Sequence, residues 1–352
     1  MKKKYYELYK QIKNEIINCD YKAGDKLPSK RVMADKLGCS IITVENAYGM
    51  LLEEGYICAK ERSGYFVEKL DVIKGDGDVS HNRSPKFLDE NVVATTPDFE
   101  SSVWLKTVRK VILERNNELF VKAPTKGCAV LRNAIARYLL RYRGMHADAK
   151  NIIIGSGAEQ LYENVVKVLG RNKIFGIEDP CYEKIKEVYL GEGVTLKRLK
   201  MGENGILSTE LNRKNFDVLH VTPFNSFPSG ITATAKKRYE YLTLAKNKGC
   251  YVVEDDFASE FFQPGHPIES LYSLDSEQRV IYINTFSKSL SASMRIGYMI
   301  LPENLLSKYD EVLGGFSCSV PVLEQYVLAE FINSGNFERH LNIVRRKLAK
   351  NK

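Results

Sequence analysis

The sequence predicts two joined folds: a large α/β domain with a mostly parallel sheet covered by helices on both faces, and before it a small α+β module. Two observations support this prediction. From about residue 151 onward, short apolar runs alternate with amphipathic helical stretches, which is typical of parallel strands buried between two layers of helices. Within the first 68 residues, three helical stretches are followed by two short runs with the character of strands.

The composition fits an ordinary globular protein. The chain has 352 residues, 44% of them hydrophobic, and no apolar run approaches the roughly 20 residues that span a bilayer. Met1-Lys2-Lys3-Lys4 is not followed by an apolar segment, so we expect no signal peptide. The seven cysteines are scattered without a C-x-x-C pair, and no two histidines lie at metal-ligand spacing. We therefore expect free thiols, a cytoplasmic location and no metal site, while the net charge of +8 permits a nucleic-acid partner without requiring one.

The N-terminal module begins with an amphipathic pattern over residues 5–19, which predicts a helix. Ser29 is expected to cap a second helix over residues 30–37, and Gly38 to end it. The residues of this second helix that we expect to face inward are Val32, Met33 and Leu37.

Ser40 is expected to cap a third helix that extends to about residue 54. Its predicted buried stripe consists of Val44, Ala47, Tyr48, Leu51 and Leu52. Two strands are expected over residues 56–59 and 65–67, joined by a short polar turn. Three helices followed by a hairpin is the order of elements in a winged helix-turn-helix.

The segment LPSKRVMADKLGCSIITVENAYGMLLEEGYI closely resembles the N-terminal domain of GntR-type transcription regulators, and the similarity covers residues 5–68. The resemblance implies that double-stranded DNA is the partner and that the helix from Ser40 is the recognition helix. The DNA-contacting residues that it implies are Ser40, Thr43 and Asn46 on that helix, Ser29 and Arg31 at the DNA backbone, and Arg62, Ser63 and Gly64 at the wing tip. Many relatives have a basic residue at Ile41 and some at Glu45, so this chain is expected to bind DNA more weakly and with less salt dependence.

A polar stretch rich in glycine and charge follows, and we interpret it as a linker. The expected organisation is a DNA-binding module over residues 1–69, the linker over residues 70–92, and the large domain over residues 93–352. The strands expected in the large domain cover residues 151–154, 173–177, 194–198, 217–222, 251–254 and 280–284, and its helices include 103–113, 129–142, 158–169, 182–190 and 235–248.

Ligands in parallel sheets bind at the carboxyl ends of the strands, and polar motifs stand at several of those ends. Gly155-Ser156-Gly157 opens a helix and can offer backbone N–H groups to a phosphate, or can form only a tight turn. Glu254-Asp255-Asp256 ends a buried strand; such carboxylates can meet a protonated pyridine nitrogen, bind a metal, or be solvated at a loop start. Tyr182 can stack on a cofactor or fill the core.

The segment Thr285-Phe286-Ser287-Lys288-Ser289, with Arg295 seven residues after the lysine, carries the most specific chemistry. A lysine here can form an imine with an aldehyde while the hydroxyls and the arginine hold a phosphate, or it can be an ordinary surface lysine. Asn225 stands in another loop that follows a predicted strand.

Together these motifs resemble the fold-type I aminotransferases, the pyridoxal 5′-phosphate (PLP) family, from about residue 93 to the end. A GntR-like module joined to such a domain is similar to the MocR subfamily of regulators. The resemblance implies that Lys288 forms the internal aldimine with PLP, Asp255 pairs with the pyridine N–H and Tyr182 stacks on the ring. The phosphate ligands that it implies are Arg295, Thr285, Ser287 and the amides of Ala158 and Glu159, directly after Gly157.

The sequence departs from that family at three places. Phe257 stands where relatives usually have a tyrosine that bonds the phenolic oxygen of the cofactor. Phe227 stands where aminotransferases have an asparagine, a role that Asn225 is proposed to take over. The helix expected at residues 337–347 resembles the one that introduces the C-terminal lobe, so we expect most of that lobe, with its carboxylate-binding arginine, to be lacking.

The expected function is that of a homodimeric PLP-binding transcription regulator, which senses PLP or an amino compound through its aminotransferase-like domain. Two alternatives are a working PLP-dependent aminotransferase with an appended DNA-binding domain, and a regulator that still binds DNA but no longer senses PLP.

Overall fold

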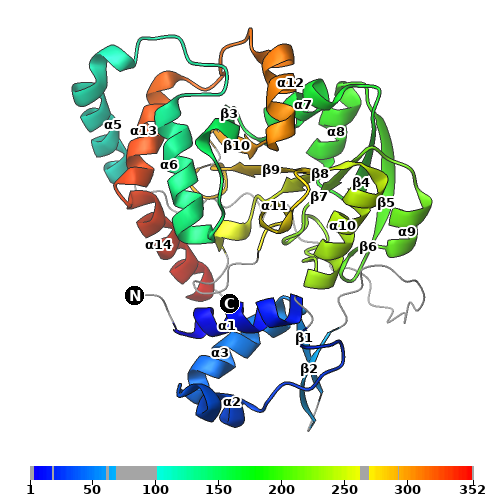
Figure 1. Ribbon diagram of the computed structural model, residues 1–352. Coiled ribbons are helices and arrows are strands. Elements are labelled where there is room, and N and C mark those ends of the chain that lie inside the picture. The colour runs from blue at the N-terminus through cyan, green and yellow to red at the C-terminus, as the bar shows by residue number, and fades with distance from the viewer. Residues whose placement is uncertain are drawn as a thin grey trace. The chain divides into compact units, whose positions relative to one another are not determined.

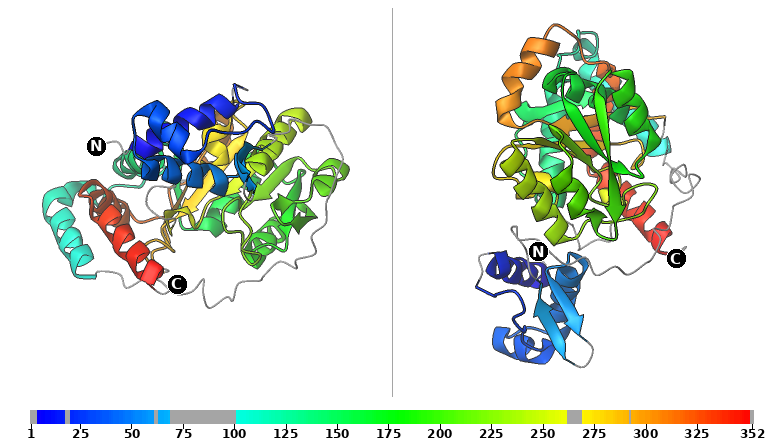
Figure 2. Two further views of the ribbon diagram at one scale, coloured as in Figure 1. Left: turned by 90° about the horizontal axis from the view of Figure 1, so that it is seen from below. Right: turned by 90° about the vertical axis from the view of Figure 1, so that its right-hand side faces the viewer.

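The computed structural model describes residues 4–17, 20–60, 63–68, 101–261, 269–291 and 293–350 (Figures 1 and 2). The chain forms two compact units. The first contains the described residues up to 68 together with residues 233–243, and the second contains residues 101–232, 244–261 and 269–350. The expected linker and Arg62 lie outside the described residues.

The N-terminal unit has the order of elements expected from the sequence. It consists of α1 (Lys4–Ile17), α2 (Lys30–Leu37), α3 (Ile41–Glu53), β1 (Ile57–Lys60) and β2 (Gly64–Val67). The two strands form an antiparallel hairpin. The fold of this unit is therefore a winged helix-turn-helix, as predicted.

Both predicted helix caps of this unit are confirmed. The Ser29 side chain accepts a hydrogen bond from the backbone N–H of Val32 at 3.4 Å, and the Ser40 side chain accepts one from Thr43 at 3.1 Å. Gly38 ends α2 with a φ of +59°, a conformation that costs glycine little. Each cap contributes about 1 kcal/mol to helix stability.

The expectation for two residues of α2 was wrong. Met33 is buried, but Val32 and Leu37 are 56% and 40% exposed. Val32 is one position from Met33 and is therefore rotated by about 100° around the helix axis, away from the core. Leu37 lies on the same side as Met33 but is the last residue of a helix of only two turns.

A buried ion pair connects α1 to the end of α3. Lys13 Nζ lies 3.0 Å from Glu54 Oε2, and each side chain is 3% exposed. The Tyr9 hydroxyl donates a hydrogen bond to the other oxygen of Glu54 at 2.7 Å, and Lys13 donates one to the Tyr9 oxygen at 3.0 Å. The two charges are thus compensated by protein groups alone. Removal of either partner would leave the other charge buried and unpaired.

The second unit contains an eight-stranded sheet of order β3-β10-β9-β8-β7-β4-β5-β6. The strands are β3 (Ile152–Gly155), β4 (Ile174–Asp179), β5 (Thr195–Gly202), β6 (Gly205–Ile206), β7 (Val218–Val221), β8 (Tyr251–Asp255), β9 (Val280–Thr285) and β10 (Gly297–Ile300). The pairs β9-β8-β7-β4-β5 are parallel, β10 is antiparallel to both of its neighbours, and β6 is antiparallel to β5. The predicted mostly parallel sheet is therefore confirmed, while β10 and β6 were not anticipated.

Helices cover both faces of this sheet (Figure 1). The helices of the second unit are α5 (Ser101–Arg115), α6 (Ala129–Tyr138), α7 (Ala158–Leu169), α8 (Glu183–Gly191), α9 (Ser208–Arg213), α11 (Leu271–Leu274), α12 (Glu303–Leu313), α13 (Val322–Asn333) and α14 (Asn336–Lys350), with the short helical segments η1 (Asn116–Glu118), η2 (Leu139–Arg143), η3 (Ala149–Asn151) and η4 (Ser259–Phe261). The helix α10 (Ala235–Lys248) begins in the first unit and ends in the second. None of the described helices is long and apolar enough to cross a membrane.

Successive residues of a strand enter two different cores, both at the edge of the sheet, on β3, and inside it, on β9. Ile152 and Ile154 pack with residues of α6, α13 and α14, whereas Ile153 between them packs with residues of α7, α8 and α12. Tyr282 and Ile283 on β9 divide in the same way. This alternation explains why the strands read as continuous apolar runs in the sequence.

We predict that Lys13→Ala destabilises the N-terminal unit by about 3–5 kcal/mol, because the substitution leaves the Glu54 carboxylate buried without its cation. Hydrogen exchange of the α1 and α3 amides, read by mass spectrometry, measures this free energy locally. The control is Lys30→Ala, which removes a partly exposed ion pair with Glu45 and should change stability by less than about 1 kcal/mol. Equal effects of the two substitutions would show that the Lys13–Glu54 pair contributes no more than a surface contact.

Candidate functional site

The polar residues predicted for the cofactor site lie after the carboxyl ends of neighbouring strands. Gly157 follows β3, Tyr182 follows β4 and Asn225 follows β7. Asp255 is the last residue of β8 and pairs in register with Ile283 of β9, two positions before Thr285. Because these strands run in one direction, their loops gather at one edge of the sheet, where ligands bind in such folds.

Asp255 is buried and lacks one hydrogen-bond partner. The Tyr162 hydroxyl donates to Asp255 Oδ2, and His220 Nε2 lies 3.9 Å from the same oxygen. The other ring nitrogen of His220 is hydrogen-bonded to the Tyr189 hydroxyl at 2.7 Å. Asp255 Oδ1 is shielded from solvent and has no partner within the described residues. A buried carboxylate oxygen without a donor is costly, so a ligand that carries an N–H group fits this position.

The three consecutive acids have three different environments. All are at most 4% exposed, so the possibility that they are solvated is wrong. Glu254 accepts hydrogen bonds from the backbone N–H groups of Leu271 and Tyr272, and burial raises its pKa to about 8. Asp256 pairs with Arg143 at 2.9 Å and accepts a hydrogen bond from Tyr282 at 2.7 Å. Each acid has its own partners, and in the described parts of the chain no group of three or more metal-ligating side chains is found.

Lys288 lies in the loop after β9 and is only partly exposed. Its Nζ atom is 4.5 Å from the centre of the Phe257 ring and 5.8 Å from that of Phe261. Burial lowers the pKa of Lys288 below its usual value, and the Glu260 carboxylate acts in the opposite direction. A lowered pKa increases the fraction of neutral amine, the form that attacks an aldehyde.

A candidate phosphate cradle is formed where α7 begins. Gly157 has a φ of +94°, and a Cβ atom there would lie 3.0 Å from Arg295 Nη2. The guanidinium therefore lies beside Gly157, the residue that caps α7. The first-turn amides of a helix attract anions. Arg295 Nη2 also lies 3.1 Å from Glu159 Oε2. Both side chains are about half exposed, so a bound phosphate would compete with Glu159 for the guanidinium.

The remaining predicted cofactor residues lie around this cradle or in the adjoining loops. Thr285 ends β9, and the Ser287 hydroxyl donates to the carbonyl of Met294 at 3.2 Å. Tyr182 is 43% exposed, and its ring centre is 6.0 Å from that of Phe227 at an angle of 74°. Asn225 has a φ of +51°, and its backbone N–H donates to Thr232.

Sequence reasoning missed the residues that surround the predicted ones. Tyr162, His220 and Tyr189 form the polar contacts behind Asp255, and Arg143 neutralises Asp256. His220 was the one detectable signal, because a histidine inside the apolar strand β7 is unusual in a fully buried strand.

The predicted DNA-contacting residues are grouped on α2, α3 and the hairpin. Ser29 and Ser40 use their side chains to cap helices, and the Ser40 and Thr43 hydroxyls are 2.8 Å apart. Arg31 and Asn46 are exposed, and Gly64 begins β2 with a φ of +109°. The predicted contacts that are exposed are Ser29, Arg31, Ser40, Asn46 and Ser63.

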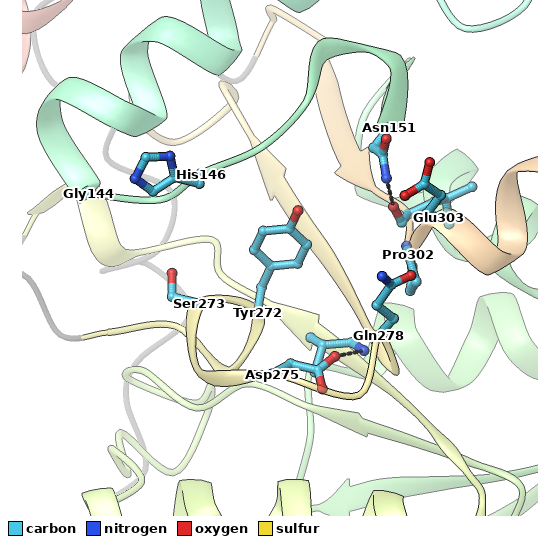
Figure 3. Close-up of a pocket in the computed structure, with 11 residues that line it drawn as sticks. Gly144, His146, Asn151, Tyr272, Ser273, Asp275, Gln278, Pro302 and Glu303 are labelled. Carbon is cyan, nitrogen blue, oxygen red and sulfur yellow. Dashed lines mark hydrogen bonds between the residues drawn. The ribbon is translucent and has the colours of Figure 1, made fainter. Parts of the chain in front are cut away.

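A cavity of about 320 Å³ lies at the opposite ends of the strands. Its lining includes Asn151 before β3, Val280 at the start of β9 and Leu301 after β10. Figure 3 shows Tyr272 directed into this space and the hydrogen bond from Asn151 to Leu301. None of the residues predicted for the cofactor site lines this cavity.

Two protein families match this chain. The family described as bacterial regulatory proteins, gntR family, matches residues 4–67, and the family described as aminotransferase class I and II matches residues 88–352.

Curated relatives match along nearly the whole chain. The chain is 33% identical to the HTH-type transcriptional regulator YdeL of Bacillus subtilis, with 97% of this chain and 76% of the relative covered. It is 28% identical to the probable rhizopine catabolism regulatory protein MocR of Rhizobium meliloti, with 97% and 74% covered. It is 26% identical to the pyridoxine biosynthesis regulator PdxR of Corynebacterium glutamicum, with 97% and 75% covered.

Solved structures with the same fold are aminotransferases. An archaeal alanine:glyoxylate aminotransferase superposes with a TM-score of 0.65 at 23% identity, covering 70% of this chain and 64% of that one. The kynurenine aminotransferase of Pyrococcus horikoshii gives a TM-score of 0.66 at 24% identity, covering 72% and 66%. The chain therefore spans slightly less than two thirds of each enzyme, and the likeness establishes the fold.

The order of the two domains, the matched families and the whole-chain relatives lead to one assignment. This chain belongs to the MocR subfamily of GntR-type transcription regulators, in which a GntR helix-turn-helix domain precedes an aminotransferase class I and II domain.

Proposed function

We propose that this protein is a cytoplasmic, homodimeric transcription regulator that binds PLP in its aminotransferase-like unit and an operator duplex through its winged helix-turn-helix. PLP, or an amino compound bound to it, changes the affinity for the operator. The observation that supports this proposal most strongly is the unpartnered Asp255 Oδ1 on the strand adjacent to the one that leads to Lys288.

The residues at the edge of the sheet fit PLP as a ligand. Asp255 accepts the pyridine N–H through its free oxygen, and Tyr162 holds that carboxylate in place. Arg295 and the first amides of α7 bind the phosphate at Gly157. When bound, PLP supplies an aldehyde that a neutral lysine amine can capture and a ring that withdraws electrons.

Phe257 favours a sensor over an enzyme. Its ring faces the Lys288 amine, so no hydroxyl at this position can hold the phenolic oxygen of the cofactor. The loss of such a hydrogen bond weakens binding by about 1.5–3 kcal/mol. Weaker binding allows occupancy to follow the PLP concentration, which suits a sensor.

We predict that adding PLP to the full chain produces a visible absorption band that Lys288→Ala abolishes. Asp255→Asn should keep the band but lower PLP affinity by about ten- to a hundredfold, because a charge-assisted hydrogen bond is lost. Spectrophotometric titration with PLP measures both effects. Asp310→Asn is the matched control, since Asp310 is exposed and paired with Lys126. If the band persists in Lys288→Ala, Lys288 does not react with PLP. If Asp255→Asn leaves the PLP affinity unchanged, Asp255 does not bind the pyridine N–H.

We also predict how the reaction of Lys288 with PLP depends on pH. The rate should rise with pH through the pKa of Lys288, with a midpoint below 10.5, because burial lowers this pKa. Glu260→Gln should lower the midpoint further, since the Glu260 carboxylate raises the pKa of Lys288. The neutral amine is then more abundant, and stopped-flow absorbance should record a faster reaction at pH 8.

Glu303→Gln, which removes one exposed carboxylate from a different part of the unit, is the control. A slower reaction in Glu260→Gln than in this control would contradict the electrostatic role of Glu260.

A further inference from the structure

The outward face of α3 carries isoleucines where a DNA-binding helix commonly carries cations. Ile41 and Ile42, in the first turn, are 44% and 68% exposed. The core-facing side of the same helix is fully occupied, with Val44, Ala47 and Tyr48 buried. The core of this unit is therefore packed without the two isoleucines.

The same face holds little charge. Ile42, Asn46 and Gly49 follow one another at spacings of four and three residues, which places them on one side of the helix. The sequence of α3 contains no lysine or arginine, and Glu45 on this side pairs with Lys30 at 2.6 Å. This helix therefore lacks the cationic side chains that commonly read guanine in the major groove.

Gly49 leaves open space on this face of α3. Glycine is unfavourable inside a helix, yet a Cβ atom at Gly49 would meet nothing within 4 Å, and its φ is not positive. The fold itself therefore gives no reason for a glycine here. Because Gly49 has no side chain, the helix backbone beside Asn46 and Ile42 is left uncovered, as close contact with a groove requires.

We infer that Ile42, with Ile41 beside it, contacts thymine C5-methyl groups in the major groove, and that this protein selects operators with thymine under the first turn of α3. This inference rests on the proposed DNA binding. Thymine is the base that presents an apolar group in the major groove, and apolar side chains read it. Asn46, one turn further along the same face, has the amide that pairs with N6 and N7 of adenine. Both side chains therefore favour A·T base pairs.

The test begins with a pool of random DNA duplexes, from which the full chain selects its preferred sequence with and without PLP. In the selected duplex each thymine is then replaced singly by deoxyuridine, which removes only the methyl group. Fluorescence anisotropy gives the Kd for each duplex. At the contacted thymine we expect about a fourfold loss of affinity for the wild type, the effect of one buried methyl group.

Variants of the protein assign that loss to a residue. Ile42→Ala should bind thymine and deoxyuridine duplexes equally, because the partner of the methyl group is gone. Leu190→Ala, an exposed leucine on α8 in the other unit, should keep the fourfold difference. The inference is overturned if the wild type does not distinguish the two bases, if Ile42→Ala keeps the full difference, or if Ile42→Ala alters only the oligomeric state. Failure to select any duplex would instead refute the proposed DNA binding itself.

Discussion

The proposed site of the large unit is organised around Asp255, a buried carboxylate with one oxygen that is unpartnered within the described part of the chain. Tyr162 from α7 donates a hydrogen bond to the other oxygen, and His220 Nε2 from β7 lies 3.9 Å from it. The parallel pairing of β8 with β9 places Asp255 beside the strand that leads to Lys288. A buried charge is tolerated only when its surroundings compensate it. The fold supplies part of that compensation and leaves Asp255 Oδ1 without a partner among the described residues. We propose that the N–H group of a ligand completes it.

Successive side chains along β8 point to opposite faces of the sheet. Asp255 is therefore separated from its neighbours Glu254 and Asp256. Asp255 points to the proposed ligand, whereas Glu254 and Asp256 point to the opposite face. There two backbone amides hydrogen-bond Glu254, and Arg143 pairs with Asp256. Glu260, which influences Lys288, contacts Asn284 on β9 at 2.7 Å. Burial, followed by the neighbouring Asp256 carboxylate, raises the pKa of Glu260. The charge near Lys288 therefore depends on a buried network of carboxylates that begins at Asp256, one residue after Asp255.

Short-range signals made much of this architecture predictable. Ser29 and Ser40 each cap a helix through a residue three positions away, and Gly38 ends α2 through contacts three and four positions back. The strands of the large sheet are recognisable in the sequence as short apolar runs. Val32 and Leu37 were misplaced because periodicity alone does not tell which stripe of a two-turn helix faces inward. β10 is only four residues long and follows directly on the Arg295 motif, which concealed it. Tyr162 and Arg143, the partners of Asp255 and Asp256, are distant in sequence, and only the folded chain shows those pairings.

We propose that occupancy of the site at Lys288 controls operator binding by the winged helix-turn-helix. The most direct measurement is the Kd for a selected operator duplex, determined by fluorescence anisotropy with and without PLP, for the wild type and for Lys288→Ala. We expect PLP to change the Kd of the wild type and to leave that of Lys288→Ala unchanged. A wild-type Kd that does not respond to PLP, or an equal response in both proteins, would contradict this proposal.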